Sequence, residues 1–163
     1  MSIYESDKKI MKIIVIAAGS GKRLGKKTKN IPKYLLDVSG KTILEHQLEV
    51  FKKTNFEKFV IITGPYKEKF VAKKFTCVED VDYHKHDILG SLMVAREHIK
   101  GDVLIVYSDI IFDDSIIKQM VETQADIAIA VDLEWEKSYE ERIEHTRSEA
   151  ENVLLDKSFN VLE

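Results

Sequence analysis

Apolar runs alternate with helical patterns from Met11 to Val131 of this 163-residue chain. Short runs rich in β-branched residues and bounded by glycine, proline or aspartate are typical of buried strands. Such runs predict strands at 13–18, 59–63, 75–78, 103–107 and 126–131. Apolar residues three and four positions apart predict helices at 42–55, 66–74, 88–99 and 113–123. This alternation predicts an α/β fold, with a mostly parallel, doubly wound, Rossmann-like sheet and helices on both faces.

The last part of the chain has a different character. Residues 132–151 are rich in acidic side chains and contain the only tryptophan, Trp135. A stretch of this kind is typical of a solvated loop or helix. Two short apolar runs, at 153–155 and 161–162, flank residues that suit a turn. They predict a terminal hairpin.

Three predicted strands end in residues that suit a ligand. The first strand runs into a glycine-rich loop at 19–21, the second is followed by Gly64, and the fourth is followed by Ser108 and Asp109. In open α/β sheets, ligands bind at the carboxyl ends of the strands. We therefore expect the glycine-rich loop, Gly64 and Asp109 to share one site.

The segment after the first strand is strongly basic. Between positions 22 and 33 it holds no acidic residue and six basic ones, Lys22, Arg23, Lys26, Lys27, Lys29 and Lys33. So many like charges repel one another unless an anion lies among them. Backbone N–H groups of a glycine-rich loop bind phosphate oxygens. The segment therefore indicates a polyphosphate site, and the alternative is a solvated basic loop.

Two common phosphate loops do not match this segment. The P-loop pattern needs glycine at position 16 and serine or threonine at position 23, where the chain has Ile16 and Arg23. The dinucleotide fingerprint needs glycine at position 24, where the chain has Leu24. Neither the P-loop nor the dinucleotide fold is therefore expected.

Asp109 has the chemistry of a metal ligand. It directly follows a predicted buried strand. Mg²⁺ is usually held by one or two protein carboxylates together with substrate phosphates, so an aspartate among phosphate-binding groups suits it. The alternative is that Asp109 only caps the next turn.

The motif A-A-G-S-G-K-R-L at 17–24, followed by P-K-Y-L-L at 32–36, resembles the nucleotidyltransferase signature. The resemblance implies a nucleotide-diphospho-sugar transferase-like fold. It also implies that Arg23 and Lys33 hold the triphosphate and that Asp109 binds Mg²⁺. The nucleotide-binding residues that it implies are Ala17, Ala18, Gly19, Ser20, Gly21, Lys22, Gly64, Asp87, Gly90 and Ser91.

The later part of the chain looks most like members that act on small phosphorylated or phosphonylated acceptors, such as phosphocholine or aminoethylphosphonate, with CTP. The resemblance implies attack of an acceptor oxygen on the α-phosphorus and release of pyrophosphate, in support of cell-surface glycan or lipid decoration. It makes Glu149 and Glu151 candidates for contacts with the acceptor or the metal. The ionised acceptor phosphate needs no general base at pH 7, because its second pKa lies near 6.

Three other functions remain open. Sugar-1-phosphate nucleotidyltransferases share the same glycine-rich loop. A nucleotide-binding module without turnover would carry the same motif. Nucleic-acid binding is the third alternative, prompted by the basic loop. It is disfavoured by the net charge of −3 and by the absence of aromatic residues between Lys22 and Lys33.

Composition narrows the class of protein. The hydrophobic content of 44% and charged content of 33% are typical of a soluble globular chain. No apolar run approaches the roughly 20 residues of a membrane span, and the N-terminus lacks a secretory-type segment. We therefore expect a cytoplasmic protein without a membrane partner, with a lead-in at 1–10 and a single domain at 11–163.

Domains of the resembled family continue beyond the point where this chain stops, at 160–163. The resemblance therefore implies a domain truncated at its C-terminal end. An open sheet edge would then be exposed, and a second copy in a homo-oligomer would cover it.

Overall fold

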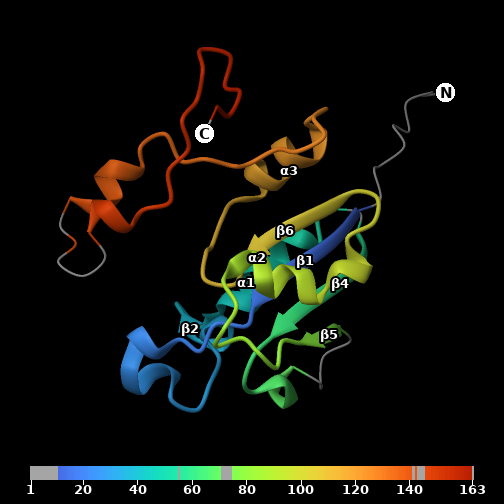
Figure 1. Cartoon of the computed structure of the whole chain (residues 1–163), viewed down its shortest axis with the longest axis vertical. Coiled ribbons are helices and arrows are strands. Elements are labelled where there is room, and N and C mark those ends of the chain that lie inside the picture. Colours follow the sequence, from blue (N-terminus) through green and yellow to red (C-terminus); the bar gives the residue numbers. More distant parts are fainter. Residues whose placement is uncertain (1–10, 55, 71–74, 141, 143–145, 163) are drawn as a thin grey trace. The chain divides into compact units, whose positions relative to one another are not determined.

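The computed structural model describes residues 11–54, 56–70, 75–140, 142 and 146–162 (Figure 1). The chain divides into two compact units, Met1–Asp126 and Ile127–Glu163. The predicted lead-in at 1–10 lies outside the described residues. The single domain expected for 11–163 stays a prediction.

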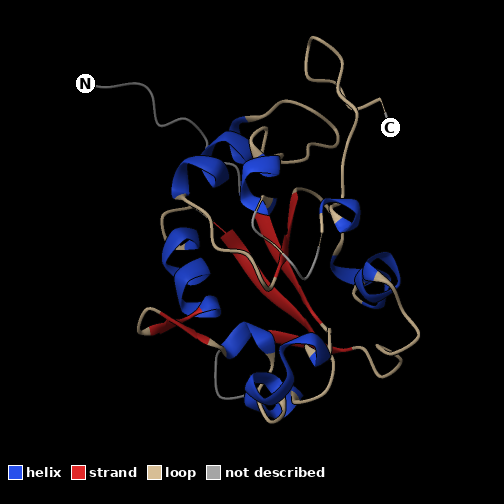
Figure 2. Ribbon diagram, turned by 90° about the vertical axis from the view of Figure 1, so that its left-hand side faces the viewer, coloured by secondary structure: helices blue, strands red, loops and turns tan. Residues whose placement is uncertain are grey.

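A parallel sheet forms the centre of the first unit (Figure 2). Its strand order is β5-β4-β1-β6, and every neighbouring pair is parallel. The strands are β1 (Met11–Ala17), β4 (Phe56–Thr63), β5 (Thr76–Glu79) and β6 (Val103–Tyr107). The predicted α/β fold with a parallel sheet is confirmed.

Helices cover both faces of this sheet, because the side chains of β1 alternate between two apolar cores. Ile13 and Val15 face the core that includes α1 (Ile43–Phe51) and α3 (Asp114–Glu122). On the other face, Ile14 packs in a second core that includes Leu92 of α2 (Ile88–Val94). The arrangement is therefore doubly wound, as the sequence predicts.

Short elements connect these helices and strands. A small antiparallel pair, β2 (Asp37–Val38) and β3 (Lys41–Thr42), precedes α1. The 3₁₀ turns of the first unit are η1 (Lys22–Thr28), η2 (Lys33–Leu35), η3 (Lys67–Lys69) and η4 (Arg96–His98).

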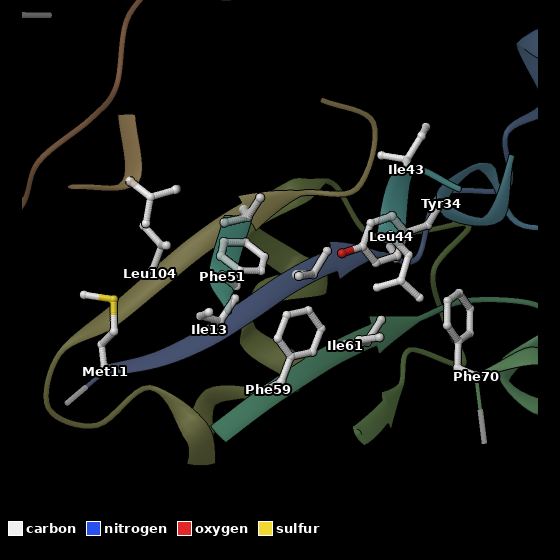
Figure 3. Close-up of a cluster of buried hydrophobic side chains, with 14 residues drawn as sticks. Met11, Ile13, Tyr34, Ile43, Leu44, Phe51, Phe59, Ile61, Phe70 and Leu104 are labelled. Atoms are coloured by element: carbon white, nitrogen blue, oxygen red, sulfur yellow. The ribbon is translucent and has the colours of Figure 1, made fainter. Parts of the chain in front are cut away.

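Aromatic rings fill the larger core (Figure 3). The Phe51 ring of α1 lies 5.7 Å from the Phe59 ring and 5.8 Å from the Phe112 ring, measured between centroids. The Tyr34 ring is also part of this cluster and lies 6.4 Å from the Phe70 ring. Through this cluster, η2 and α1 pack against the sheet.

The start of α1 forms the predicted capping box. The Glu45 backbone N–H donates to Thr42 Oγ1 at 3.2 Å, and the Thr42 N–H donates to Glu45 Oε2 at 2.8 Å. These bonds satisfy backbone groups that a helix start otherwise leaves unpaired. The helix ends at Phe51, before the predicted stop at Asn55, which lies outside the described residues.

Two predicted helices are shorter than expected. The helix predicted at 66–74 contains only the turn η3 among its described residues, and 71–74 lie outside them. The helix predicted at 88–99 ends at Val94 and continues as the separate turn η4. Apolar spacing alone does not reveal where an α-helix tightens into a 3₁₀ turn.

The strand predicted at 126–131 is wrong. These residues form no strand, and the Ile127 side chain is 86% exposed. A run of β-branched residues becomes a strand only where another strand accepts its backbone hydrogen bonds. The described residues provide no such partner for this run.

The second unit contains the turns η5 (Trp135–Tyr139) and η6 (Arg147–Glu149). The predicted terminal hairpin is confirmed by an antiparallel bridge between Leu155 and Val161. Asp156 Oδ1 closes its turn by accepting the backbone N–H groups of Ser158 and Asn160, both at 2.8 Å.

No helix in the described ranges is both long enough and apolar enough to span a membrane.

Candidate active site

The carboxyl ends of three strands meet at one edge of the sheet. The register places Ala17 beside Thr63 and Ile16 beside Tyr107. The glycine-rich loop, Gly64 and Asp109 follow these strand ends in the sequence, so they leave the sheet at the same edge. The geometry gives the common location that the sequence predicts, and the roles of the residues stay predictions.

An ion pair joins two of the predicted site residues at this edge. Lys33 Nζ, from η2, lies 2.8 Å from Asp109 Oδ2, which follows β6. The two side chains are 29% and 44% exposed. An ion pair this open to water contributes only about 0–1 kcal/mol to stability. Fold stability therefore gives little reason for two charges to lie together here.

Two hydrogen bonds hold the backbone of the basic segment. Gly21 has a φ of +65°, and its carbonyl oxygen accepts a hydrogen bond from the buried Thr28 hydroxyl at 2.6 Å. The Tyr66 hydroxyl, which comes from the turn after β4, donates to the Lys29 carbonyl oxygen at 2.6 Å. These bonds give the basic segment a defined path next to the strand ends.

Lys22 and Arg23 lie in η1, within this basic segment. Their side chains are outside the described part of the structure. The structure therefore brings together Lys33 and Asp109, and the triphosphate role of Arg23 stays a prediction.

Gly64 lies where two backbones approach each other closely. A Cβ at this position would fall 2.1 Å from the Ala18 carbonyl oxygen, which is far inside van der Waals contact. Gly64 therefore allows the end of β4 to approach the start of the glycine-rich loop, and both segments belong to the predicted nucleotide site.

We expect Gly64→Ala to lower the free energy of unfolding by about 2 kcal/mol, because the backbone must shift to admit the methyl group. Urea unfolding measures this change. Gly19→Ala is the matched control, because a Cβ at Gly19 would meet no atom within 4 Å. Equal losses in the two variants would contradict the close approach of the backbones.

A buried carboxylate, that of Asp80, lies next to the nucleotide-binding residues predicted at the start of α2. Asp80 is 1% exposed, and its Oδ2 accepts a hydrogen bond from the Ser91 hydroxyl at 2.8 Å. Its Oδ1 lies 2.9 Å from His86 Nδ1. Asp87 caps α2, with Oδ1 accepting from the Gly90 N–H at 2.7 Å.

The structure thus gathers Asp87, Gly90 and Ser91 at the start of α2. The Ser91 hydroxyl is bonded to Asp80, and the side chain is buried at 5% exposure. Its side chain is turned into the protein in this structure, whereas the resemblance implies that Ser91 binds the nucleotide.

The predicted acceptor residues Glu149 and Glu151 belong to the second unit. Glu151 is exposed, and the side chain of Glu149 is outside the described part of the chain. Their role stays a prediction.

Sequence reasoning missed two buried polar residues near this edge, Asp80 and Gln47. Gln47 lies on the buried face of α1 with Leu44 and Phe51. The sequence signal for Gln47 was its polar side chain at a position where the helical pattern is otherwise apolar.

Comparisons with known proteins agree with this architecture. The model of the family described as MobA-like NTP transferase domain matches residues 13–145. A CTP:phosphoglutamine cytidylyltransferase from Campylobacter jejuni is 24% identical over 158 residues, which cover 89% of this chain and 62% of that protein. A bifunctional protein GlmU from Methanococcus maripaludis is 36% identical over 109 residues, which cover 65% of this chain and 26% of that protein.

A similar solved structure is that of a CTP:phosphocholine cytidylyltransferase from Streptococcus pneumoniae. It superposes with a TM-score of 0.58 at 29% identity, over 65% of this chain and 50% of that one. The chain thus spans less than two thirds of the length of these relatives.

Proposed function

The chain belongs to the family of MobA-like NTP transferase domains, and from this premise we propose that it transfers CMP from CTP to a small phosphorylated or phosphonylated acceptor. Pyrophosphate is the second product. Two relatives support this choice of substrates by their names, the CTP:phosphoglutamine and CTP:phosphocholine cytidylyltransferases.

The observation that carries the proposal is the 2.8 Å pair between Lys33 and Asp109. One cation and one carboxylate therefore lie together at the carboxyl-terminal edge of the sheet, where open α/β sheets bind ligands. A nucleoside triphosphate with its metal ion needs both signs of charge, a cation for the phosphate oxygens and a carboxylate for the metal.

The Asp109 carboxylate fits a Mg²⁺ ion. It is 44% exposed, so it is open to a hydrated ion, and it lies at the strand end where phosphates are expected. A single carboxylate is enough when substrate phosphates supply further oxygens. Bound there, Mg²⁺ would neutralise phosphate charge and orient the triphosphate.

In the proposed reaction, an acceptor oxygen forms a new bond to the α-phosphorus of CTP. The bond from the α-phosphorus to the bridging oxygen breaks, and pyrophosphate leaves with the electron pair. The acceptor is already ionised at pH 7, so no side chain has to remove a proton. Lys33 and Arg23 would stabilise the charge that grows on the leaving pyrophosphate, while the loop amides hold the phosphates in line.

A panel of nucleotides and acceptors tests this proposal. CTP, UTP, GTP, ATP and dTTP are each incubated with Mg²⁺ and phosphocholine, aminoethylphosphonate or glucose-1-phosphate, and pyrophosphate release is measured. We expect release with CTP and with one of the first two acceptors. The absence of release with every pair, together with calorimetric binding of CTP, would instead indicate a nucleotide-binding module without turnover.

A second candidate is transfer to a sugar-1-phosphate. It is favoured by two relatives, the Methanococcus maripaludis protein GlmU and a UTP–glucose-1-phosphate uridylyltransferase from Haloferax volcanii, which is 29% identical over 143 residues. The same panel distinguishes the two candidates, because this one requires release with UTP and glucose-1-phosphate.

A further inference from the structure

A single buried amide connects the two chain segments that carry the Lys33–Asp109 pair. Gln47, on α1, is 1% exposed. Its Oε1 accepts a hydrogen bond from the Tyr34 hydroxyl at 2.7 Å. Its Nε2 donates to two backbone carbonyl oxygens, those of Tyr107 at 2.9 Å and Ile110 at 2.7 Å. We call these three hydrogen bonds the Gln47 bridge.

The Gln47 bridge includes hydrogen bonds to the backbone on both sides of Asp109. Tyr107 is the last residue of β6, and Ile110 immediately follows Asp109. Both hydrogens of the amide are used, one on each carbonyl. The turn from Tyr107 to Ile110 is therefore held at both of its ends by one side chain.

The other end of the Gln47 bridge reaches the segment that carries Lys33. Tyr34 directly follows Lys33 in η2, and its ring packs in the larger core (Figure 3). Burial raises the pKa of the Tyr34 hydroxyl far above its ordinary value. The hydroxyl therefore stays protonated and keeps donating to Gln47 at any pH at which the protein would work.

The packing of α1 does not require an amide at this position. Its other buried residues, Ile43, Leu44 and Phe51, are all apolar. A buried polar side chain is unfavourable unless its groups are bonded, and it then fixes the geometry of its partners. The Gln47 bridge supplies such bonds to the two segments whose charged side chains meet at 2.8 Å.

We propose that Gln47 is a positioning residue that fixes the two backbone segments carrying Lys33 and Asp109, so that both side chains can reach a metal-bound triphosphate. This inference rests on the proposed function. It assigns Gln47 no contact with substrate, because its amide is fully used within the protein. Displacement of a binding group by about 1 Å is enough to weaken catalysis strongly, so such a positioning residue has a measurable effect.

Gln47→Leu tests the proposal, because leucine is similar in size to glutamine but apolar, so it removes all three hydrogen bonds. We expect the affinity for CTP with Mg²⁺, measured by calorimetry without acceptor, to fall about tenfold. Amide hydrogen exchange at 108–111 should become faster than in the rest of the first unit. The thermal midpoint should also fall, because the buried Tyr34 hydroxyl and the two carbonyl groups lose their partner. Tyr34→Phe removes one bond of the three and should lower the affinity by about threefold.

Gln119→Leu is the matched control, because Gln119 is exposed on α3 and the substitution is the same. It should leave affinity, exchange and midpoint unchanged. The inference is overturned if Gln47→Leu binds like the parent protein with unchanged exchange. It is also overturned if the affinity falls while exchange rises equally throughout the first unit, because that pattern is general destabilisation.

The exchange measurement separates this inference from the proposed function. If the parent protein itself does not bind CTP with Mg²⁺, the proposed nucleotide site is wrong. Faster exchange confined to 108–111 in Gln47→Leu would still support the Gln47 bridge, and unchanged exchange would overturn it. If Gln47→Leu does not fold, Tyr34→Phe decides between these outcomes by the same measurements.

Discussion

Asp109→Asn is expected to lower the rate of pyrophosphate release by about a hundredfold to a thousandfold, in the range seen when a charge-stabilising group is removed from an active site. Asparagine keeps the shape of the side chain and removes its negative charge. The variant therefore loses the carboxylate proposed to hold Mg²⁺ and the charge that pairs with Lys33 at 2.8 Å. The rate is measured at saturating CTP, Mg²⁺ and acceptor.

The fold should tolerate this change. The Lys33–Asp109 pair is partly exposed, so its loss should lower the free energy of unfolding by less than about 1 kcal/mol. Asp114→Asn is the matched control, because Asp114 Oδ2 pairs with Lys53 Nζ at 2.7 Å on the surface of α3. Asp114→Asn should keep its full rate. Similar rates in the two variants would contradict the role of Asp109.

The sheet could be predicted because its strands are buried on both faces. Ile13, Ile14 and Val15 are all fully buried although they face two different cores. Such strands are continuous apolar runs in the sequence, and glycine or aspartate marks their ends. The run at 126–131 has the same local character, but strand formation depends on a pairing partner that local sequence does not report.

The location of the candidate site could be predicted from local motifs, whereas its internal supports could not. The glycine-rich loop and Asp109 each follow an apolar run directly, so strand ends place them. The partners of Gln47 lie 13, 60 and 63 residues away along the chain. Asp80, which directly follows β5, meets its partner Ser91 11 residues further along the chain. A polar residue in an apolar pattern shows that a partner is needed, and the fold decides which one it finds.

Lys33→Met is expected to change two affinities in opposite directions. In the free protein Lys33 Nζ bonds Asp109 Oδ2 at 2.8 Å, so it competes with a cation for that carboxylate. Methionine keeps the apolar stem and removes the charge. Binding of Mn²⁺ alone, used as a spectroscopic substitute for Mg²⁺, should therefore become about threefold to tenfold tighter, in line with the modest strength of an exposed ion pair.

The same substitution should weaken binding of CTP with Mg²⁺ by about a hundredfold, because a charge-assisted bond to a phosphate oxygen is lost while the other phosphate contacts remain. Electron paramagnetic resonance measures free Mn²⁺, and calorimetry measures CTP. Lys53→Met removes the partner of Asp114 and is the control, with no change expected in either affinity. If Lys33→Met weakened metal and nucleotide binding together, Lys33 would support the site without competing for Asp109. If CTP bound with its original affinity, Lys33 would not contact the triphosphate. The positive charge that neutralises the triphosphate would then have to come from the other cations of the basic segment, at 22–29.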